Sequence, residues 1–273
     1  MNIIFRKLKA AKNIIVRNYR WQKDGILCRK ELKQKELLSL DNKRIAVLAP
    51  HSDDEWIGCS RLLLKNPNNV TVINMDMQGG DSEELHALRF EEMRSVAQKI
   101  GYELITAGKS KEEFLCRFLT ENSVDVVMLP GYYDWHDEHF AVMDAFSCAA
   151  KKIGYDGLVG MYQVSLPMPE CLINYASVMR KKELKRKWSD LKKYYPSQDF
   201  LPIKRFMINE HINGGIIVAY AIESYSIMHV KKWQDKYNYN KLTNEEKILL
   251  RSNLNRISFV REKLQQKERD NDI

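Results

Sequence analysis

Residues 44–55 read Arg-Ile-Ala-Val-Leu-Ala-Pro-His-Ser-Asp-Asp-Glu, an apolar run that ends in a proline and a polar loop. The run has the length and composition of a buried strand, and residues 56–65, which follow the loop, have the pattern of a helix. The same order recurs at 124–139, where an apolar segment is stopped by Pro-Gly and followed by a loop rich in histidine and acidic residues. Repeated strand–loop–helix units predict an α/β protein with a mostly parallel sheet.

This alternation continues through the middle of the chain. Strands are expected at 44–49, 70–75, 103–106, 124–129 and 158–164, and helices at 56–65, 82–100, 109–120 and 138–153. Such an order predicts a Rossmann-like, doubly wound sheet with helices on both faces. Beyond Pro167 the alternation fades, and we expect helices at 176–194 and 244–267.

The composition is that of a globular protein with a full core. Of the 273 residues, 44% are hydrophobic and 29% are charged, which excludes a disordered or fibrous chain. No apolar run reaches the roughly 18 to 20 residues that a bilayer span requires, and the first twenty residues lack the apolar core of a signal peptide. The five cysteines are widely spaced and include no Cys-x-x-Cys pair, which is typical of a reducing compartment. We therefore expect a cytoplasmic protein.

Basic residues outnumber acidic ones by 44 to 36, so the chain has a formal charge of +8 and favours anionic partners. Six of the basic residues fall within 1–20, a stretch without any acidic residue, where Ile4, Leu8, Ala11 and Ile15 recur at helical spacing. Two interpretations remain open. This helix could lie on an anionic membrane surface, or it could pack on the domain with its charges in water.

Three of the six histidines sit in the two loops that follow the strands at 44–49 and 124–129. His51 lies in the first loop, and His136 and His139 lie in the second. Ligand-binding and catalytic groups gather at the carboxyl ends of parallel strands, so both loops are expected to open onto one crevice.

The residue types in these loops indicate a metal site. One histidine and one carboxylate from the first loop, with one histidine from the second, would leave an open coordination position, as in catalytic zinc sites. A carboxylate beside the ion can take a proton from water, and a further histidine can stabilise an oxyanion or protonate a leaving nitrogen. The alternative is that acidic residues gather in these loops simply because loops are solvated.

The two loops resemble the signatures of the PIG-L/LmbE-like de-N-acetylases, metal-dependent hydrolases that remove acetyl groups from N-acetylglucosamine-type sugars. The family's His-Pro-Asp-Asp-Glu motif is similar to His-Ser-Asp-Asp-Glu at 51–55, and its His-Pro-Asp-His motif is similar to His-Asp-Glu-His at 136–139. The segment 88–92 looks like the family's Arg-x-x-Glu helix. With weaker matches further on, the resemblance covers roughly residues 43–210.

The resemblance implies a role for each of seven residues. His51, Asp54 and His139 would be the metal ligands, with zinc as the default ion and another divalent transition metal as an alternative. Asp53 would be the general base that deprotonates the attacking water, and His136 would stabilise the oxyanion or protonate the leaving amine.

The two remaining residues would act around these groups. Glu138 stands where the family has the Asp that orients His136, and Arg89 would contact sugar hydroxyls or a neighbouring anionic group. Ser52 replaces the family's proline and Glu138 replaces its Asp, but neither change deletes a chemical role. An active enzyme is therefore expected. Asp134 could join the site or simply face water.

These features predict a metal-dependent hydrolase that converts an N-acetylglucosamine-type conjugate to acetate and a free amino sugar. The cationic stretches at 1–20 and 180–193 favour an anionic conjugate, whether nucleotide-, phosphate- or lipid-linked, and allow peripheral contact with the inner membrane face. No nucleic acid partner is expected. One alternative is a non-catalytic basic module that binds anionic membrane or nucleic acid, and another is a metal-dependent amidase that acts on a non-sugar acetamide.

Three regions are expected along the chain. They are a basic helical segment at 1–42, a catalytic domain at 43–210, and a mostly helical extension at 211–273 that packs on the same domain.

Overall fold

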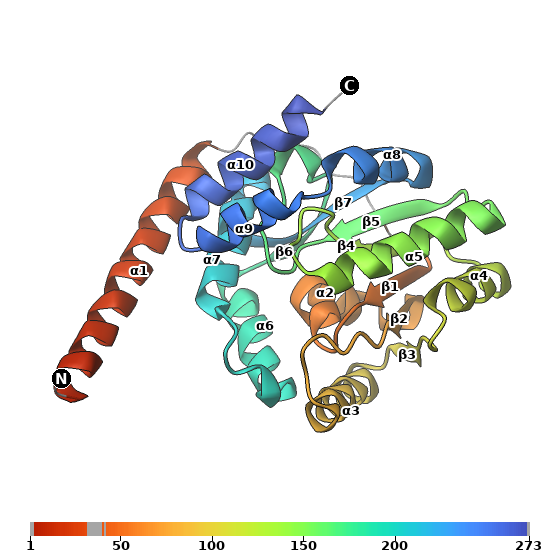
Figure 1. Cartoon of the computed structure of the whole chain (residues 1–273), viewed down its shortest axis with the longest axis horizontal. Helices are drawn as coiled ribbons and strands as arrows, with labels where there is room; N and C mark the ends of the chain where they lie inside the picture. Colours follow the sequence, from red (N-terminus) through yellow and green to blue (C-terminus); the bar gives the residue numbers. More distant parts are fainter. Residues whose placement is uncertain (1–2, 32–39, 41, 272–273) are drawn as a thin grey trace.

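The computed structural model describes residues 3–31, 40 and 42–271. Within this part of the chain, seven strands form one sheet in the order β3-β2-β1-β4-β5-β7-β6 (Figure 1). The strands are β1 (Ile45–Ala49), β2 (Val70–Asn74), β3 (Glu103–Thr106), β4 (Val126–Pro130), β5 (Leu158–Tyr162), β6 (Tyr175–Met179) and β7 (Ala221–His229). Strands β1 to β5 pair in parallel, whereas β7 is antiparallel to both of its neighbours. The structure confirms the predicted fold class, a mostly parallel sheet in a Rossmann-like α/β arrangement.

Helices cover both faces of the sheet, because successive side chains of a strand point to opposite sides. On β1, Ala46 and Leu48 belong to one hydrophobic core, and Val47 and Ala49 belong to the other. The first core is covered by α4 (Lys111–Glu121), α5 (Asp137–Ile153) and α8 (Val230–Asn240). The second is covered by α2 (Asp54–Lys65), α3 (Glu83–Ile100) and α6 (Lys181–Tyr194).

The remaining helices lie toward the two ends of the chain. They are α1 (Ile3–Glu31), α7 (Ile203–Asn213), α9 (Asn244–Ser252) and α10 (Ile257–Asp270), with short 3-10 helices η1 (Pro67–Asn69), η2 (Glu170–Leu172), η3 (Pro196–Gln198) and η4 (Gly214–Ile217). In the described part of the chain, no helix is both long enough and apolar enough to cross a bilayer.

The predicted helix at 82–100 shows how closely local signals define an element. Ser82 caps the start of α3 by accepting a hydrogen bond from the Leu85 N–H, and Gly101 ends the helix in the left-handed conformation with φ of 91°. A serine at the start and a glycine at the end are the residue types that these two positions favour.

The prediction of one helix over 176–194 was wrong in its first part. Residues Tyr175–Met179 form β6, which pairs with β7, and only Lys181–Tyr194 is helical. Strand β7 was also not predicted, because the segment 211–273 was expected to be mostly helical. The helical pattern of the basic residues after β6 does not extend back into Tyr175–Met179. Pairing with β7 makes that segment a strand.

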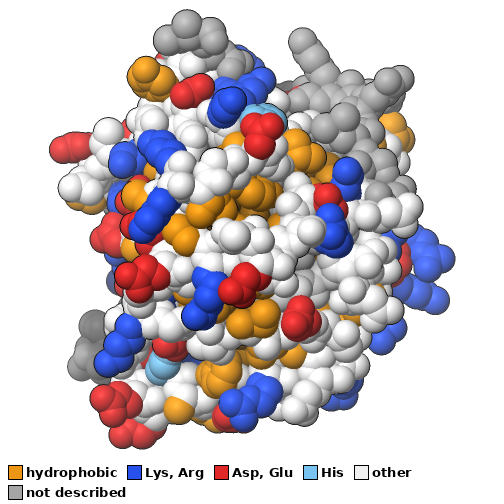
Figure 2. All heavy atoms as spheres, turned by 90° about the vertical axis from the view of Figure 1, so that its right-hand side faces the viewer, with side chains coloured by type: hydrophobic (Ala, Val, Ile, Leu, Met, Phe, Trp, Pro, Cys, Tyr) orange, Lys and Arg blue, Asp and Glu red, His pale blue; other side chains and the backbone are white. Residues whose placement is uncertain are grey.

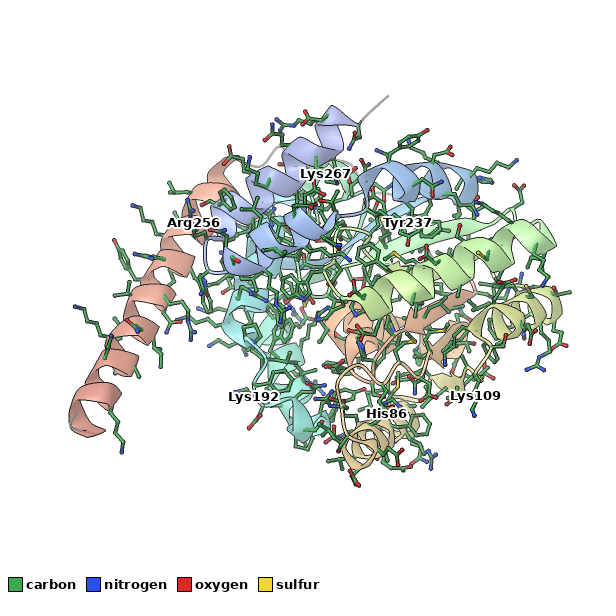
Figure 3. The ribbon with its side chains drawn as sticks, in the orientation of Figure 1. His86, Lys109, Lys192, Tyr237, Arg256 and Lys267 are labelled. Atoms are coloured by element: carbon green, nitrogen blue, oxygen red, sulfur yellow. The ribbon has the colours of Figure 1, made fainter. Side chains whose placement is uncertain are left out.

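The single helix predicted at 244–267 is two helices, α9 and α10, separated by residues 253–256. At the break, the side chains of Ser252 and Asn253 bond to the backbone carbonyls of Ile248 and Leu249. Polar side chains of this kind compete with helix formation. Figure 3 shows Arg256 at the start of α10 and Lys267 further along the same helix.

Candidate metal centre at the carboxyl edge of the sheet

The two polar loops meet at the edge where β1 and β4 end. The first loop leads from β1 into α2 and the second from β4 into α5, and the two strands are parallel neighbours (Figure 1). The ring centres of His51 and His139 are 5.3 Å apart, and those of His136 and His139 are 4.8 Å apart. The parallel sheet thus places all three loop histidines in one cluster.

His51, Asp54 and His139 form a group that could hold a metal ion, with one donor atom of each residue within 4.8 Å of the others. The Asp54 Oδ2 atom is 3.3 Å from His51 Nδ1 and 3.3 Å from His139 Nε2. Ligands about 2.1 Å from a tetrahedral ion stand about 3.4 Å from one another. The donor types and their separations therefore fit a zinc-like ion with a position left open.

The ring nitrogens of His139 support this fit. The residue is fully buried, and within the described chain neither nitrogen makes a hydrogen bond of acceptable geometry. Burial alone would lower the pKa of His139, but the nearby carboxylates of Asp54 and Asp134 raise it to about 10. Buried polar atoms normally make hydrogen bonds, whereas these two nitrogens have, among the described residues, only carboxylate oxygens at 3.3 and 3.4 Å. The negatively charged pocket around them is therefore suited to a cation.

Asp53 and Asp54 stand side by side at the start of α2 in different electrostatic surroundings. Burial would raise the pKa of Asp54, but His139 and His51 hold it below its usual range. Burial, followed by the charges of Asp54 and Glu55, raises the pKa of Asp53 well above its usual range. A carboxylate with a raised pKa is a stronger proton acceptor, which is what a general base requires.

The backbone of Asp53 is strained. Its φ of 147° and ψ of −21° lie outside the regions that residues with a side chain favour. Its carbonyl accepts hydrogen bonds from the backbone N–H groups of Trp56 and Ile57, at 3.0 and 2.9 Å, so the strained residue also anchors the first turn of α2. Strain of this kind costs about 1–3 kcal/mol and is concentrated at functional sites.

The carboxylate that contacts His136 comes from Asp134. Its Oδ1 atom is 3.0 Å from His136 Nδ1, and its Oδ2 atom is 3.4 Å from His139 Nδ1. Asp134 is buried and also accepts a hydrogen bond from the Ser165 N–H at 3.2 Å. Burial would raise the pKa of Asp134, but His139 and His136 hold it well below its usual range. One ionised carboxylate thus contacts both histidines of the second loop.

Glu138 was predicted to orient His136, and the structure places it elsewhere. No hydrogen bond joins the two side chains in the described structure, and the Glu138 carboxylate lies near Gly79. A Cβ atom added at Gly79 would stand 3.8 Å from Glu138 Oε1 and 3.6 Å from His51 Nε2. The physical reason is that Asp134, held in a turn by its N–H bond to the carbonyl of Gly131, already occupies the buried side of His136.

The cluster opens into a pocket of about 270 Å³. All seven residues singled out by the resemblance line this pocket: His51, Asp53, Asp54, Arg89, His136, Glu138 and His139. Residues 78–81 and parts of the segment 198–206 complete the wall. The sequence therefore predicted which side chains surround the pocket, while the roles given to them remain predictions.

Arg89 reaches the pocket from α3, where Asp81 holds it in an ion pair. Its guanidinium group also lies 5.9 Å from the centre of the Phe200 ring. Because Asp81 offsets part of its charge, Arg89 presents less positive potential to a ligand than the sequence alone suggests.

The sequence did not single out two further residues at the site. The Ser165 Oγ atom is 3.1 Å from His136 Nδ1, and the Phe200 side chain, 67% exposed, stands on the pocket wall. Ser165 follows the carboxyl end of β5, so the rule that found the two loops could have found it. Phe200 lies in a segment after η3 that carries no pattern pointing to the pocket.

No family model matches this sequence, and no curated protein matches it. The fold is similar to that of the conserved protein TT1542 from Thermus thermophilus, with a TM-score of 0.53 and 16% identity over 67% of this chain and 94% of that chain. It is also similar to the A40926 pseudoaglycone deacetylase Dbv21, with a TM-score of 0.51 and 17% identity over 70% of this chain and 99% of that chain. Similarity at this level of identity establishes a shared fold.

Proposed function

We propose that this chain is a metal-dependent de-N-acetylase of the PIG-L/LmbE-like family that acts on an N-acetylglucosamine-type sugar conjugate. The observation that carries the proposal is the convergence of His51, Asp54 and His139 on one pocket, with Asp53 beside them. The fold shared with the deacetylase Dbv21 supports it.

Each residue of the cluster has a distinct task in this proposal. His51, Asp54 and His139 would hold a divalent ion, for which zinc is the first candidate. Such an ion, when bound, supplies Lewis acidity toward the acetyl carbonyl and toward water. Asp53 accepts a proton from the attacking water, and His136 donates a proton to the leaving nitrogen.

The reaction is the hydrolysis of an amide. The water oxygen forms a bond to the acetyl carbon, the bond between that carbon and nitrogen breaks, and the nitrogen leaves as a protonated amine. Asp134 assists by holding the Nδ1 side of His136, 3.0 Å away, so that the opposite edge of the ring can serve the substrate. The Nε2 atom on that edge lies 3.1 Å from the Trp135 indole nitrogen. To act as the acid, the ring must carry protons on both nitrogens, with Nδ1–H toward Asp134 and Nε2–H toward the leaving nitrogen in place of the indole.

The pocket wall suggests how a sugar conjugate would bind. Phe200 offers an exposed aromatic side chain of the kind on which sugar rings stack, and Arg89 of α3, beside it, supplies hydrogen-bond donors. Exposed lysines of α6, among them Lys185 and Lys192, add to the net positive charge of the chain, which favours an anionic conjugate. Figure 3 shows Lys192 near the carboxyl-terminal end of that helix.

The first experiment measures metal content by elemental analysis in the wild type, His139→Ala and His229→Ala. We expect about one divalent transition metal per chain in the wild type and in His229→Ala, whose histidine pairs with Asp156 away from the pocket. We expect most of the metal to be lost in His139→Ala, because one of its three ligands is gone.

The second experiment measures acetate release from N-acetylated sugar conjugates and from a simple acetamide. Asp53→Asn should keep its metal and lose at least about a hundredfold in kcat, the usual contribution of a general base. A wild type that binds no metal after reconstitution with zinc would contradict the proposal. Preferential hydrolysis of the non-sugar acetamide would show that the substrate is not a sugar conjugate, although the enzyme is still a metal-dependent amide hydrolase.

A further inference from the structure

Helix α1 has two separate faces, and only one of them is used by the rest of the protein. Trp21 and Cys28 are buried against Ile212 of α7 and Ile257 of α10. Gly25, on the same side, allows a close approach, since a Cβ atom there would stand 3.0 Å from the Ile208 side chain. The carboxyl-terminal half of α1 is thus packed on the body of the protein.

A polar contact reinforces this attachment. The Arg29 guanidinium group donates hydrogen bonds to the backbone carbonyls of His211 and Ala219. Because Arg29 is only one residue beyond Cys28, the same end of the helix is held by both apolar packing and hydrogen bonds.

The amino-terminal half of α1 extends away from the body. Figure 1 shows it running down the left of the molecule to an isolated end, and Figure 3 shows its side chains projecting into open space. Between Lys7 and Arg20, every described side chain is exposed except that of Asn18, which is half-buried. At 1.5 Å per residue, this stretch extends about 20 Å.

An apolar stripe runs along the open side of the helix. Ile15, Tyr19 and Ile26 are 68%, 67% and 59% exposed, and their spacing of four and seven residues places them on one face. Tyr19 and Cys28 are nine residues apart, which is two and a half turns, so the stripe faces away from the packed side. The helix therefore packs on the domain through Trp21 and Cys28, as one interpretation of the sequence expected, but the domain does not bury this stripe.

Basic residues border the stripe. Lys12 lies seven residues before Tyr19, and Lys23 lies four residues after it. At 3.6 residues per turn, both lysines are at the edge of the apolar face. Lys9 and Arg20 lie further around the helix from the apolar face, on the same side as Lys12 and Lys23. The sequence contains no acidic residue before Asp24. By contrast, acidic and basic side chains are intermixed over the face of the protein shown in Figure 2.

We propose that α1 is a docking surface for an anionic lipid bilayer. The apolar stripe enters the boundary between headgroups and acyl chains, and the lysines beside it contact anionic headgroups. The inference does not depend on the proposed deacetylase activity.

The charge pattern selects this occupant over others. Pairing the stripe with the same stripe of a second copy would bring Lys12 and Lys23 of both chains together, which like-charge repulsion opposes. A nucleic acid would satisfy the lysines but would leave Ile15, Tyr19 and Ile26 exposed to water. An anionic membrane surface is complementary to both the apolar and the cationic parts.

The test is co-sedimentation of the full chain with vesicles of about 70% phosphatidylcholine and about 30% phosphatidylglycerol, and with vesicles of phosphatidylcholine alone. We expect the partition coefficient on anionic vesicles at low salt to exceed that on neutral vesicles by about tenfold or more, and to fall at high salt. Lys12→Gln/Lys23→Gln should lower it by about 25-fold, roughly fivefold per charge removed. Ile15→Ser/Tyr19→Ser should lower it by about tenfold or more.

Matched controls use exposed residues on other helices. Lys231→Gln/Lys232→Gln on α8 removes the same charge, and Ile248→Ser on α9 removes an apolar side chain that is 67% exposed. Both controls should bind vesicles like the wild type, and circular dichroism should show that all variants keep their helix content.

Three results would overturn the proposal. They are a wild type that does not sediment with anionic vesicles at low salt, binding that is unchanged in both α1 variants, and a wild-type dimer that Ile15→Ser/Tyr19→Ser dissociates. The last result would identify a second copy as the occupant of the stripe.

Discussion

Two buried clusters of charged side chains lie along α2, one around its first turn and one beside its middle. In the second, Lys187 donates to the Ile57 carbonyl at 2.7 Å and contacts the carboxylates of Glu210 and Glu223. The other oxygen of Glu210 accepts from the Trp188 indole. Every hydrogen-bonding group of this cluster thus has a partner within the protein.

The cluster at the start of α2, by contrast, contains buried polar atoms that make no hydrogen bond within the described structure. Asp53, Asp54 and Asp134 gather around His139, whose buried nitrogens make no hydrogen bond in the described structure. This cluster opens into a pocket of about 270 Å³, whereas the cavity lined by Glu210 and Glu223 has about 10 Å³, the lower limit for a single water.

The difference separates a structural role from a functional one. A buried charge network that is complete within the chain holds elements together, here α2, α6, α7 and β7. A buried network of several carboxylates around histidine nitrogens that make no hydrogen bond to the described residues, open to a pocket, is suited to bind a cation. On this basis we propose ligand binding for the His139 cluster and fold stabilisation for the Lys187 cluster.

The largest expected effect tests the closed cluster. Lys187→Met leaves two buried carboxylates without their cation, and we expect it to lower the free energy of unfolding by about 3–5 kcal/mol. Denaturant titration followed by circular dichroism measures the change. Lys185→Met, two residues away on the exposed side of α6, is the control and should change stability by less than about 0.5 kcal/mol. An equal loss in both variants would refute a special role for Lys187.

The next effect tests the open cluster. Asp134→Asn keeps the shape but removes the charge that faces His136 and His139, and we expect metal affinity to fall about 10–100-fold. Competition with a chromophoric chelator measures this affinity without any need for activity. Glu138→Gln should have a smaller effect. The reverse ranking would show that Glu138 rather than Asp134 supports the metal ligands.

The pH dependence of stability sharpens the contrast. Burial, opposed by Lys187, raises the pKa of Glu210 to about 7 in the folded protein. Between about pH 4.5 and about pH 7, the native state therefore retains a proton on Glu210 that the unfolded chain has lost. The contribution of Glu210 to stability is therefore present below about pH 4.5 and is lost as the pH rises through about 7.

Glu210→Gln removes this titration and provides its measurement. Between about pH 5 and about pH 8, the free energy of unfolding of the wild type should fall by about 2 kcal/mol relative to that of the variant. Urea titrations at the two pH values give the difference. A pH-independent difference would show that Glu210 keeps one protonation state throughout.

The smallest effect concerns the pocket wall. Phe200→Ala should raise the KM for a sugar conjugate about 3–10-fold, the loss of one stacking contact, and leave kcat and metal content unchanged. Tyr239→Ala on α8 removes an aromatic side chain of similar exposure, 69%, outside the pocket. Equal KM changes in the two variants would exclude stacking on Phe200.

The sequence predicted the parallel part of the sheet and the pocket residues because both depend on local patterns. An apolar strand followed by a histidine-rich loop is visible in a dozen residues, and parallel neighbours bring such loops together. Strands β1 and β4, with His51, Asp54 and His139, were found in this way.

Features that depend on tertiary contacts were not predicted. Whether Asp134 or Glu138 contacts His136 is decided by the turn at Gly131, which directs one carboxylate inward. The strand β6 is five residues long and precedes a strongly helical segment, so only its pairing with β7 makes it a strand. The sequence indicated an apolar face on α1 that includes Ile15, but only the packing of Trp21 and Cys28 shows that this face is left exposed.

The position of β7 has a consequence for the order in which the sheet can be completed during synthesis. Strand β6 has β7 as its partner in the sheet, and β7 also pairs with β5, yet β7 ends at His229. The chain must therefore be synthesised as far as His229 before β6 and β7 can be joined to the other strands of the described sheet. Until then, the backbone groups of β5 and β6 that β7 later pairs with are open to pairing with other chains.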